Sequence, residues 1–426
     1  MKAHTTPKQN QGYFSSLTLI GLLFFTFGFI TWVNGSLIQF LKIACGLEGD
    51  VQAFLVTFAF YMAYFALALP AAFLLKKTGY KNGMAMGLII MALGSLVFIP
   101  AAILRDFNLF LIGLFLQGSG LALLQTASNP YISSIGPMES AAKRISIMGI
   151  CNKAAGMIAP LVLSALLMKN AGALETKLLA TPGLEDRNRV LEELSGRVIL
   201  PYFLLAVVLL LLAVLIWKSA LPEVETEPLP ATEAPLPAKR HVFQFRHLLL
   251  GVLCVFLYVG AEVMAGDAIG VYGSELGISI DQTKYFTTFT LVAMLLGYII
   301  GIYTIPKKIS QQTALKYSAL LGIFLTVAIY FATGYYAICG IALLGLANAL
   351  VWPALFPLAI AGLGRFTQVG SALLIMGISG GALMPLLYAT LKEEAVGWSN
   401  PAAFFACTLP AYLYILYYAL RGHKVQ

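Results

Sequence analysis

The sequence predicts an all-α membrane protein with twelve transmembrane helices in two pseudo-symmetric six-helix bundles. Three observations predict this fold: the composition, a series of long charge-free segments and an internal repeat. Of the 426 residues, 59% are hydrophobic and 11% are charged, whereas soluble globular proteins carry about 25% charged residues. The mean hydropathy of +0.85 also indicates a chain that folds mainly in lipid.

The charge-free segments predict the individual helices, because a spanning helix needs about 20 mostly apolar residues. Segments long enough for one helix cover residues 9–41, 51–75, 82–104, 107–138, 198–217, 285–306, 366–391 and 395–420. The segment 317–364 is long enough for two helices, with the turn expected at Tyr335 and Tyr336. Apolar segments near 141–168 and 247–273, interrupted by a few polar residues, complete the twelve.

The chain divides near its middle. Residues 220–245 are rich in Pro and Glu, which is typical of a flexible linker. We therefore expect an N-terminal six-helix bundle over 1–219, a cytoplasmic linker over 220–245 and a C-terminal six-helix bundle over 246–426. The loop 170–196 is predicted to form a short amphipathic helix and is too small for a catalytic domain.

Two repeated motifs support a duplication of the six-helix unit. IMGICNKAAGMIAP at 147–160 resembles IMGISGGALMP at 375–385, an offset of 228 residues. The pair Lys76-Lys77 similarly resembles Lys307-Lys308, an offset of 231 residues.

The basic residues are divided unequally between the two sides of the predicted topology. With the N-terminus in the cytoplasm, the cytoplasmic segments hold 17 Lys and Arg and the opposite segments hold nine. This asymmetry is the positive-inside signal. We therefore expect a multi-pass monomer in the lipid bilayer of a bacterial inner membrane, with both termini cytoplasmic and the first helix retained. The net charge of +8 reflects topology and does not indicate binding to nucleic acid.

The sequence shows no pattern of an enzyme. The five cysteines have no Cys-x-x-Cys spacing, and the four histidines lie near the termini or in the linker. We expect no disulfide, no metal site, no cofactor and no catalytic constellation.

Three charged residues fall inside predicted spans: Lys153, Glu262 and Asp267. Such charges cost about 2.5–3.5 kcal/mol each in a spanning helix, so they usually line a cavity or a pathway. Lys153 would neutralise one of the two acids and hold helix 5 against helix 7, or a carboxylate would bind substrate or take up a proton. Glu262 is favoured for the second role. Glu262 and Asp267 lie about 140° apart around an ideal helix unless Gly266 allows local unwinding.

Five amides and several aromatic residues lie in the same predicted spans. The amides are Asn34, Gln125, Asn129, Asn152 and Asn348, and flanking aromatic residues include Trp32, Phe58, Tyr61, Tyr64, Tyr258 and Trp352. A single amide is equally compatible with a role in helix–helix packing and with a role in a cavity. Amides both donate and accept hydrogen bonds, however, which suits sugar hydroxyls. The predicted substrate site combines Asn34, Gln125, Asn129, Asn152, Glu262 and Asn348, with Tyr61 and Trp352 as stacking residues.

The same segments carry a family resemblance over nearly the whole chain. They include FFTFGFITWVNGSLIQFLK at 24–42, LLQTASNPYISSIGP at 123–137, YVGAEV at 258–263, WPALFPLAIAGLG at 352–364 and GSALLIMGISGGALMP at 370–385. With these motifs in order, the sequence resembles the fucose-galactose-glucose:proton symporter family of the major facilitator superfamily. The resemblance implies the facilitator fold, alternating access and a hexose substrate.

Departures from the family pattern bear on mechanism. Many members have Asn-Asp in helix 1, and that Asp is held to be linked to protons, but here Asn34 is followed by Gly35. Fucose-type members have Glu where this chain has Gln125, so the resemblance implies glucose or galactose rather than fucose. Lys153 is unusual for the family and would form a compensating pair with Asp267.

Several functions stay open at this point. The first is hexose symport with a proton or sodium through Glu262 or Asp267, and the second is uncoupled hexose uniport. A multidrug exporter would be expected to have a larger and more apolar cavity, which the amides disfavour. A non-transporting sensor would keep the same fold.

Overall fold

The computed structural model describes residues 7–134, 141–169, 184–219, 241–305 and 307–425. The described regular structure is helical throughout. Of the predicted linker, residues 220–240 lie outside the described residues, and Val242–Gln244 form a short 3₁₀ helix, η2. The amphipathic helix predicted between helices 5 and 6 is confirmed as α7 (Leu184–Gly196), while 170–183 lie outside the described residues.

Helices α1 to α8 form the first half. Their bounds are α1 (Pro7–Trp32), α2 (Asn34–Ala44), α3 (Gly49–Leu104), α4 (Phe107–Ser134), α5 (Ala141–Leu167), α7 (Leu184–Gly196) and α8 (Ile199–Lys218). The 56-residue α3 contains two predicted spans, because Gly79 interrupts it with φ of 78°. Glycine adopts this left-handed conformation without steric cost.

Helices α9 to α18 form the second half. They are α9 (Arg246–Gly266), α10 (Ile269–Glu275), α11 (Ile280–Thr283), α12 (Phe286–Thr304), α13 (Gln311–Phe331), α14 (Tyr335–Ala349), α15 (Val351–Ile360), α16 (Thr367–Met376), α17 (Gly380–Lys392) and α18 (Asn400–Leu420), with 3₁₀ helices η3 (Gly364–Phe366), η4 (Gly377–Ser379) and η5 (Gly422–Lys424). The helix breaks directly after Gly266, where local unwinding was considered, because α9 ends there and α10 starts at Ile269.

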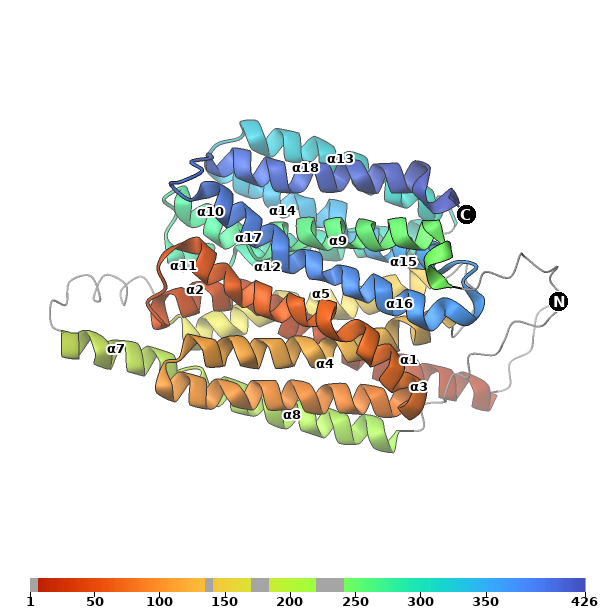
Figure 1. Ribbon diagram of the computed structural model, residues 1–426, viewed down its shortest axis with the longest axis horizontal. Coiled ribbons are helices and arrows are strands. Elements are labelled where there is room, and N and C mark those ends of the chain that lie inside the picture. Colours follow the sequence, from red (N-terminus) through yellow and green to blue (C-terminus); the bar gives the residue numbers. More distant parts are fainter. Residues whose placement is uncertain (1–6, 135–140, 170–183, 220–240, 306, 426) are drawn as a thin grey trace.

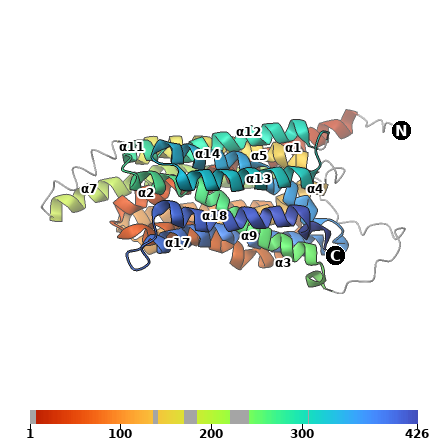
Figure 2. The ribbon, with the colours of Figure 1, turned by 90° about the horizontal axis from the view of Figure 1, so that it is seen from above.

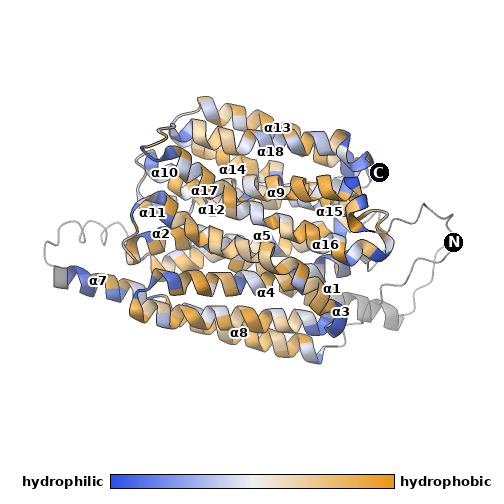
Figure 3. Ribbon diagram, viewed as in Figure 1, coloured by the Kyte–Doolittle hydropathy of each residue, from blue (hydrophilic) through white to orange (hydrophobic). Residues whose placement is uncertain are grey.

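Eleven helical segments of the described chain are long and apolar enough to span a membrane. One of them is the interrupted α3, which supplies two spans, so the twelve predicted spans are all present. The helices run side by side along the long axis of the molecule (Figures 1 and 2). Both termini lie at one end, here called the terminal end, and α2, α10 and α11 lie at the other, here called the distal end. Hydrophilic residues gather at these two ends (Figure 3).

The repeat detected in sequence corresponds to a repeated close contact. In the first half, the backbone of Gly28 on α1 lies against the backbone of Asn152 on α5. In the second half, Gly380 on α17 lies against the backbone of Phe256 on α9 in the same way. Positions 28 and 256, like positions 152 and 380, are 228 residues apart. The contact is therefore kept in both halves, but the glycine that permits it has changed helix.

Substitution of Gly380 tests this contact. In Gly380→Ala, the added methyl group would overlap the carbonyl oxygen of Phe256, and overpacking of this kind costs about 1–3 kcal/mol. We expect a lower thermal unfolding temperature in detergent. Gly196→Ala is the matched control, because nothing lies within 4 Å of the added methyl group. Equal unfolding temperatures for the two variants would contradict the close packing.

Candidate functional site

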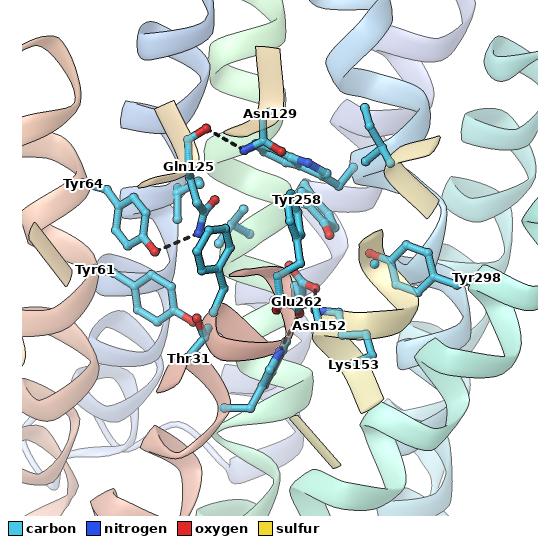
Figure 4. Close-up of a pocket in the computed structure, with 18 residues that line it drawn as sticks. Thr31, Tyr61, Tyr64, Gln125, Asn129, Asn152, Lys153, Tyr258, Glu262 and Tyr298 are labelled. Carbon is cyan, nitrogen blue, oxygen red and sulfur yellow. Dashed lines mark hydrogen bonds and ion pairs between the residues drawn. The ribbon is translucent and has the colours of Figure 1, made fainter. Parts of the chain in front are cut away.

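A central cavity of about 100 Å³ lies between the two halves. A single water needs about 10–15 Å³ measured in this way, so the cavity has room for several waters or a small polar ligand. Figure 4 shows the side chains that line it, which come from α1, α3, α4, α5, α9, α12, α15 and η4. The lining residues are Phe24, Phe27, Thr31, Trp32, Tyr61, Tyr64, Gln125, Asn129, Ile145, Gly149, Asn152, Lys153, Tyr258, Val259, Glu262, Tyr298, Trp352 and Ile378.

Polar groups of the first half are fixed by hydrogen bonds around this cavity. The Gln125 side-chain amide donates to the Tyr64 hydroxyl at 3.0 Å. The Asn129 side-chain amide donates to the backbone carbonyl of Gln125 at 2.9 Å (Figure 4). The Trp32 indole donates to Asn152 Oδ1 at 3.4 Å. Tyr61 stacks on Tyr64 with the ring centroids 6.1 Å apart. Apolar walls with a few positioned polar groups are typical of small-molecule sites.

A buried ion pair connects the two halves at the cavity. Lys153 Nζ on α5 lies 2.9 Å from Glu262 Oε1 on α9, and the two side chains are 7% and 11% exposed. The Lys153 ammonium also lies 4.2 Å from the centre of the Trp32 ring. This cation–π contact adds to the stabilisation of a desolvated ammonium. The expected compensating pair of Lys153 with Asp267 is not the one that forms.

The structure brings together most of the predicted site residues. Tyr61, Gln125, Asn129, Asn152, Lys153, Glu262 and Trp352 line the cavity. Asn34, Asn348 and Asp267 do not line it. Asn348 faces the interior of the second half, where it accepts a hydrogen bond from the Tyr412 hydroxyl at 2.9 Å. Asn34 is 1% exposed and begins α2, just after Thr31 and Trp32 of α1, which line the cavity.

Sequence reasoning left several lining residues out of the site. The sequence indicates Tyr64 and Tyr258 only as flanking aromatic residues, and it does not single out Thr31 or Tyr298. The ring of Tyr298 lies over Gly149, which leaves room for it. Gly149 within helix 5 is the sequence feature that indicates such a close approach.

A second cavity opens at the distal end, and a barrier separates it from the central one. Its lining includes Gln39 and Lys42 from the first half and Val271 and Glu275 from the second. In the barrier, Gln39 Nε2 donates to Thr283 Oγ1 at 3.3 Å.

A network of ion pairs at the distal end joins the halves through the pair between Lys392 and Asp50. Lys392 lies 2.9 Å from Asp50 and also pairs with Glu275, and Lys42 lies 2.7 Å from Asp50. The halves also touch toward the terminal end, where Gln368 Nε2 donates to the Ala72 carbonyl at 3.5 Å. The contact between Gln39 and Thr283 thus separates the central cavity from the distal cavity. On the terminal side of the central cavity, the halves are in contact through Gln368 and Ala72.

Comparison with known proteins identifies the family of this helical arrangement. The Major Facilitator Superfamily matches residues 20–385 of the chain. The chain belongs to this superfamily. It is thus a multi-pass membrane transporter and not an enzyme.

Relatives of this transporter agree with the resemblance read from its motifs. It is 34% identical over 426 residues to a "Glucose/galactose transporter" of Brucella abortus, covering 99% of this chain and 97% of that protein. It is 29% identical over 391 residues to an "L-fucose-proton symporter" of Escherichia coli, covering 91% and 89%. A crystal structure of FucP in the outward conformation matches with a TM-score of 0.77 and 27% identity, covering 96% and 99%. The resemblance to the fucose-galactose-glucose:proton symporter family is confirmed.

The buried ion pair gives a stability prediction. Lys153→Met leaves Glu262 as a buried charge without its partner, and breaking a buried pair in this way costs about 3–5 kcal/mol. We expect a large drop in the thermal unfolding temperature of the purified transporter in detergent. The double variant Lys153→Met with Glu262→Gln removes both charges and should recover most of the loss. A single variant as stable as the wild type would show that the pair is not formed.

Proposed function

We propose that the transporter carries a hexose across the bacterial inner membrane by alternating access, with both termini in the cytoplasm. The observation that carries this proposal is the lining of the central cavity, where the amides of Gln125, Asn129 and Asn152 face the carboxylate of Glu262. Hydroxyl groups of a sugar both donate and accept, so amides and a carboxylate on opposite walls can bind them. Tyr61 and Trp352, the expected stacking residues, line the cavity together with Tyr64 and offer aromatic surface for the apolar faces of a sugar.

Glucose and galactose are favoured over fucose. The chain is 34% identical to the Brucella abortus "Glucose/galactose transporter" and 29% identical to the Escherichia coli "L-fucose-proton symporter". Gln125, which the family resemblance connects with glucose and galactose, lies in the cavity and is held by Tyr64. These two observations point in the same direction.

Alternating access would use the two contact regions between the halves. Opening of the distal barrier, with separation of Lys392 from Asp50, would connect the central cavity to the outside. Loss of the contact between Gln368 and Ala72 would connect it to the cytoplasm. The positive-inside distribution of Lys and Arg supports this orientation.

Two modes of transport fit this site. Buried carboxylates at Glu262 and Asp267 support coupling to a cation, while Gly35 in place of a helix 1 carboxylate supports uncoupled uniport. A multidrug exporter is the third candidate, and the small volume of the cavity and its three amides disfavour it.

Counterflow in proteoliposomes tests the proposal. Vesicles loaded with unlabelled glucose, galactose, fucose or a non-sugar amphiphile are mixed with labelled glucose without an ion gradient. We expect labelled glucose to enter vesicles loaded with glucose or galactose, and less with fucose. Entry only with the amphiphile, or no entry with any sugar, would overturn the proposal.

Gln125 provides a specific test of the site. In Gln125→Ala, the cavity loses an amide that is positioned to bind a hydroxyl, and an unmade buried hydrogen bond costs about 1–3 kcal/mol. We expect sugar affinity to fall about 10-fold or more, since 1.4 kcal/mol corresponds to a factor of ten. The readout is sugar binding measured by calorimetry.

Gln117→Ala is the matched control for this variant. Gln117 is a buried glutamine on the same helix, donates to Ser95 at 2.8 Å and does not line the central cavity. We expect this variant to keep wild-type affinity. Equal affinity in both variants would exclude Gln125 from the substrate site.

A further inference from the structure

Asp267 lies inside the barrier between the two cavities. Along α9 and α10, the central cavity extends to Glu262 and the distal cavity begins at Val271. At 1.5 Å per residue, this interval of helix is about 13 Å long. Asp267 is near its middle, at the break between the two helices, and is 1% exposed.

The Asp267 carboxylate has no hydrogen-bond partner among the described residues, at either oxygen. Two hydroxyls nearby are directed elsewhere: Thr287 donates to the Gly266 carbonyl at 2.8 Å and Thr290 to the Ala265 carbonyl at 2.7 Å. On the facing helix, Gly35 contributes no side chain, and a β-carbon there would lie 3.3 Å from Asp267 Oδ1.

Among the charged and titratable groups that face Asp267, only Lys153 favours a negative charge there. Glu262 on α9 is itself an acid, and Tyr61 on α3 carries a neutral hydroxyl. Lys153 on α5 is the facing cation, and its ammonium is paired with Glu262. An ionised carboxylate without donors or a free cation is strongly disfavoured in a buried site, whereas a neutral carboxyl group is tolerated.

We propose that Asp267 is the proton-binding site of this transporter and that its occupancy depends on the barrier. This inference rests on the proposed sugar transport and names the coupling ion and its residue. While the barrier is closed, Asp267 carries a proton and is neutral. When α2 separates from α10 and α12, the carboxyl group meets water of the distal cavity and exchanges its proton there.

The other exit for the proton is the central cavity. Trp32 lines that cavity, and its ring lies directly against Gly266, the residue before Asp267. A shift of Trp32 would therefore expose the carboxyl group to cavity water, which accepts the proton and leaves Asp267 ionised. One proton is thus taken from water on one side and returned to water on the other. A metal cation fits this place poorly, because the neighbouring hydroxyls and carbonyls bond to each other.

Asp267→Asn separates coupling from transport. Asn imitates the neutral carboxyl group and cannot lose a proton, so we expect counterflow of glucose within about two-fold of wild type. Accumulation of glucose driven by an acidic external pH is expected in the wild type and lost in this variant. Asp267→Glu keeps an ionisable group and should retain accumulation. The control Asp281→Asn removes a half-exposed acid at the same end and should keep both activities.

Two results would overturn the proposal. One is accumulation by Asp267→Asn under the pH gradient. The other is a wild type that exchanges hexose but accumulates it only under a sodium gradient, or not at all.

Infrared difference spectroscopy between neutral and alkaline pH gives a readout that needs no sugar. We expect a protonated carboxyl band in the wild type that Asp267→Asn lacks. If the wild type exchanges no hexose but shows this band, the proposed function fails and the proton site stands. A wild type without the band, or a band unchanged in Asp267→Asn, refutes the proton site itself.

Discussion

The pair between Lys153 and Glu262 is the interaction on which the centre of this transporter depends. Each charge alone would cost about 2.5–3.5 kcal/mol in a spanning helix, and each comes from a different half, so the halves must meet where the charges are paired. The pair also places the Lys153 ammonium against the ring of Trp32, which forms part of the cavity wall. Because the pair uses the cation, Asp267, at the break between α9 and α10, is left without a cation of its own.

Much of the fold could be predicted from the sequence because the bilayer imposes a simple rule. Apolar segments that span the bilayer must do so as helices. Gly266 was compatible with local unwinding of helix 7, and the helix breaks directly after it. The interruption of α3 at Gly79 follows the same logic, since basic residues such as Lys76 and Lys77 mark the boundary between two spans.

The site could be predicted only in part, because polarity in a span shows that a side chain avoids lipid and not which cavity it faces. Asn348 and Gln125 look alike in sequence, but one bonds to Tyr412 within its own half and the other reaches the cavity. The choice of Glu262 over Asp267 as partner of Lys153 depends on the helix break and on the position of α5. Neither the helical period nor the residue types determine it.

The exchanged glycine of the repeated contact has a consequence for selectivity. With glycine at position 28, position 152 is free to carry an asparagine that reaches the cavity, whereas glycine at 380 leaves the equivalent place bare. The three amides that line the cavity all belong to the first half, and the carboxylate belongs to the second. The two halves therefore keep the same helix packing, but the side chains that they contribute to the cavity differ in chemistry. A ligand without two-fold symmetry therefore has one preferred orientation between the two halves, whereas a strictly two-fold symmetric pocket would offer it two equivalent orientations.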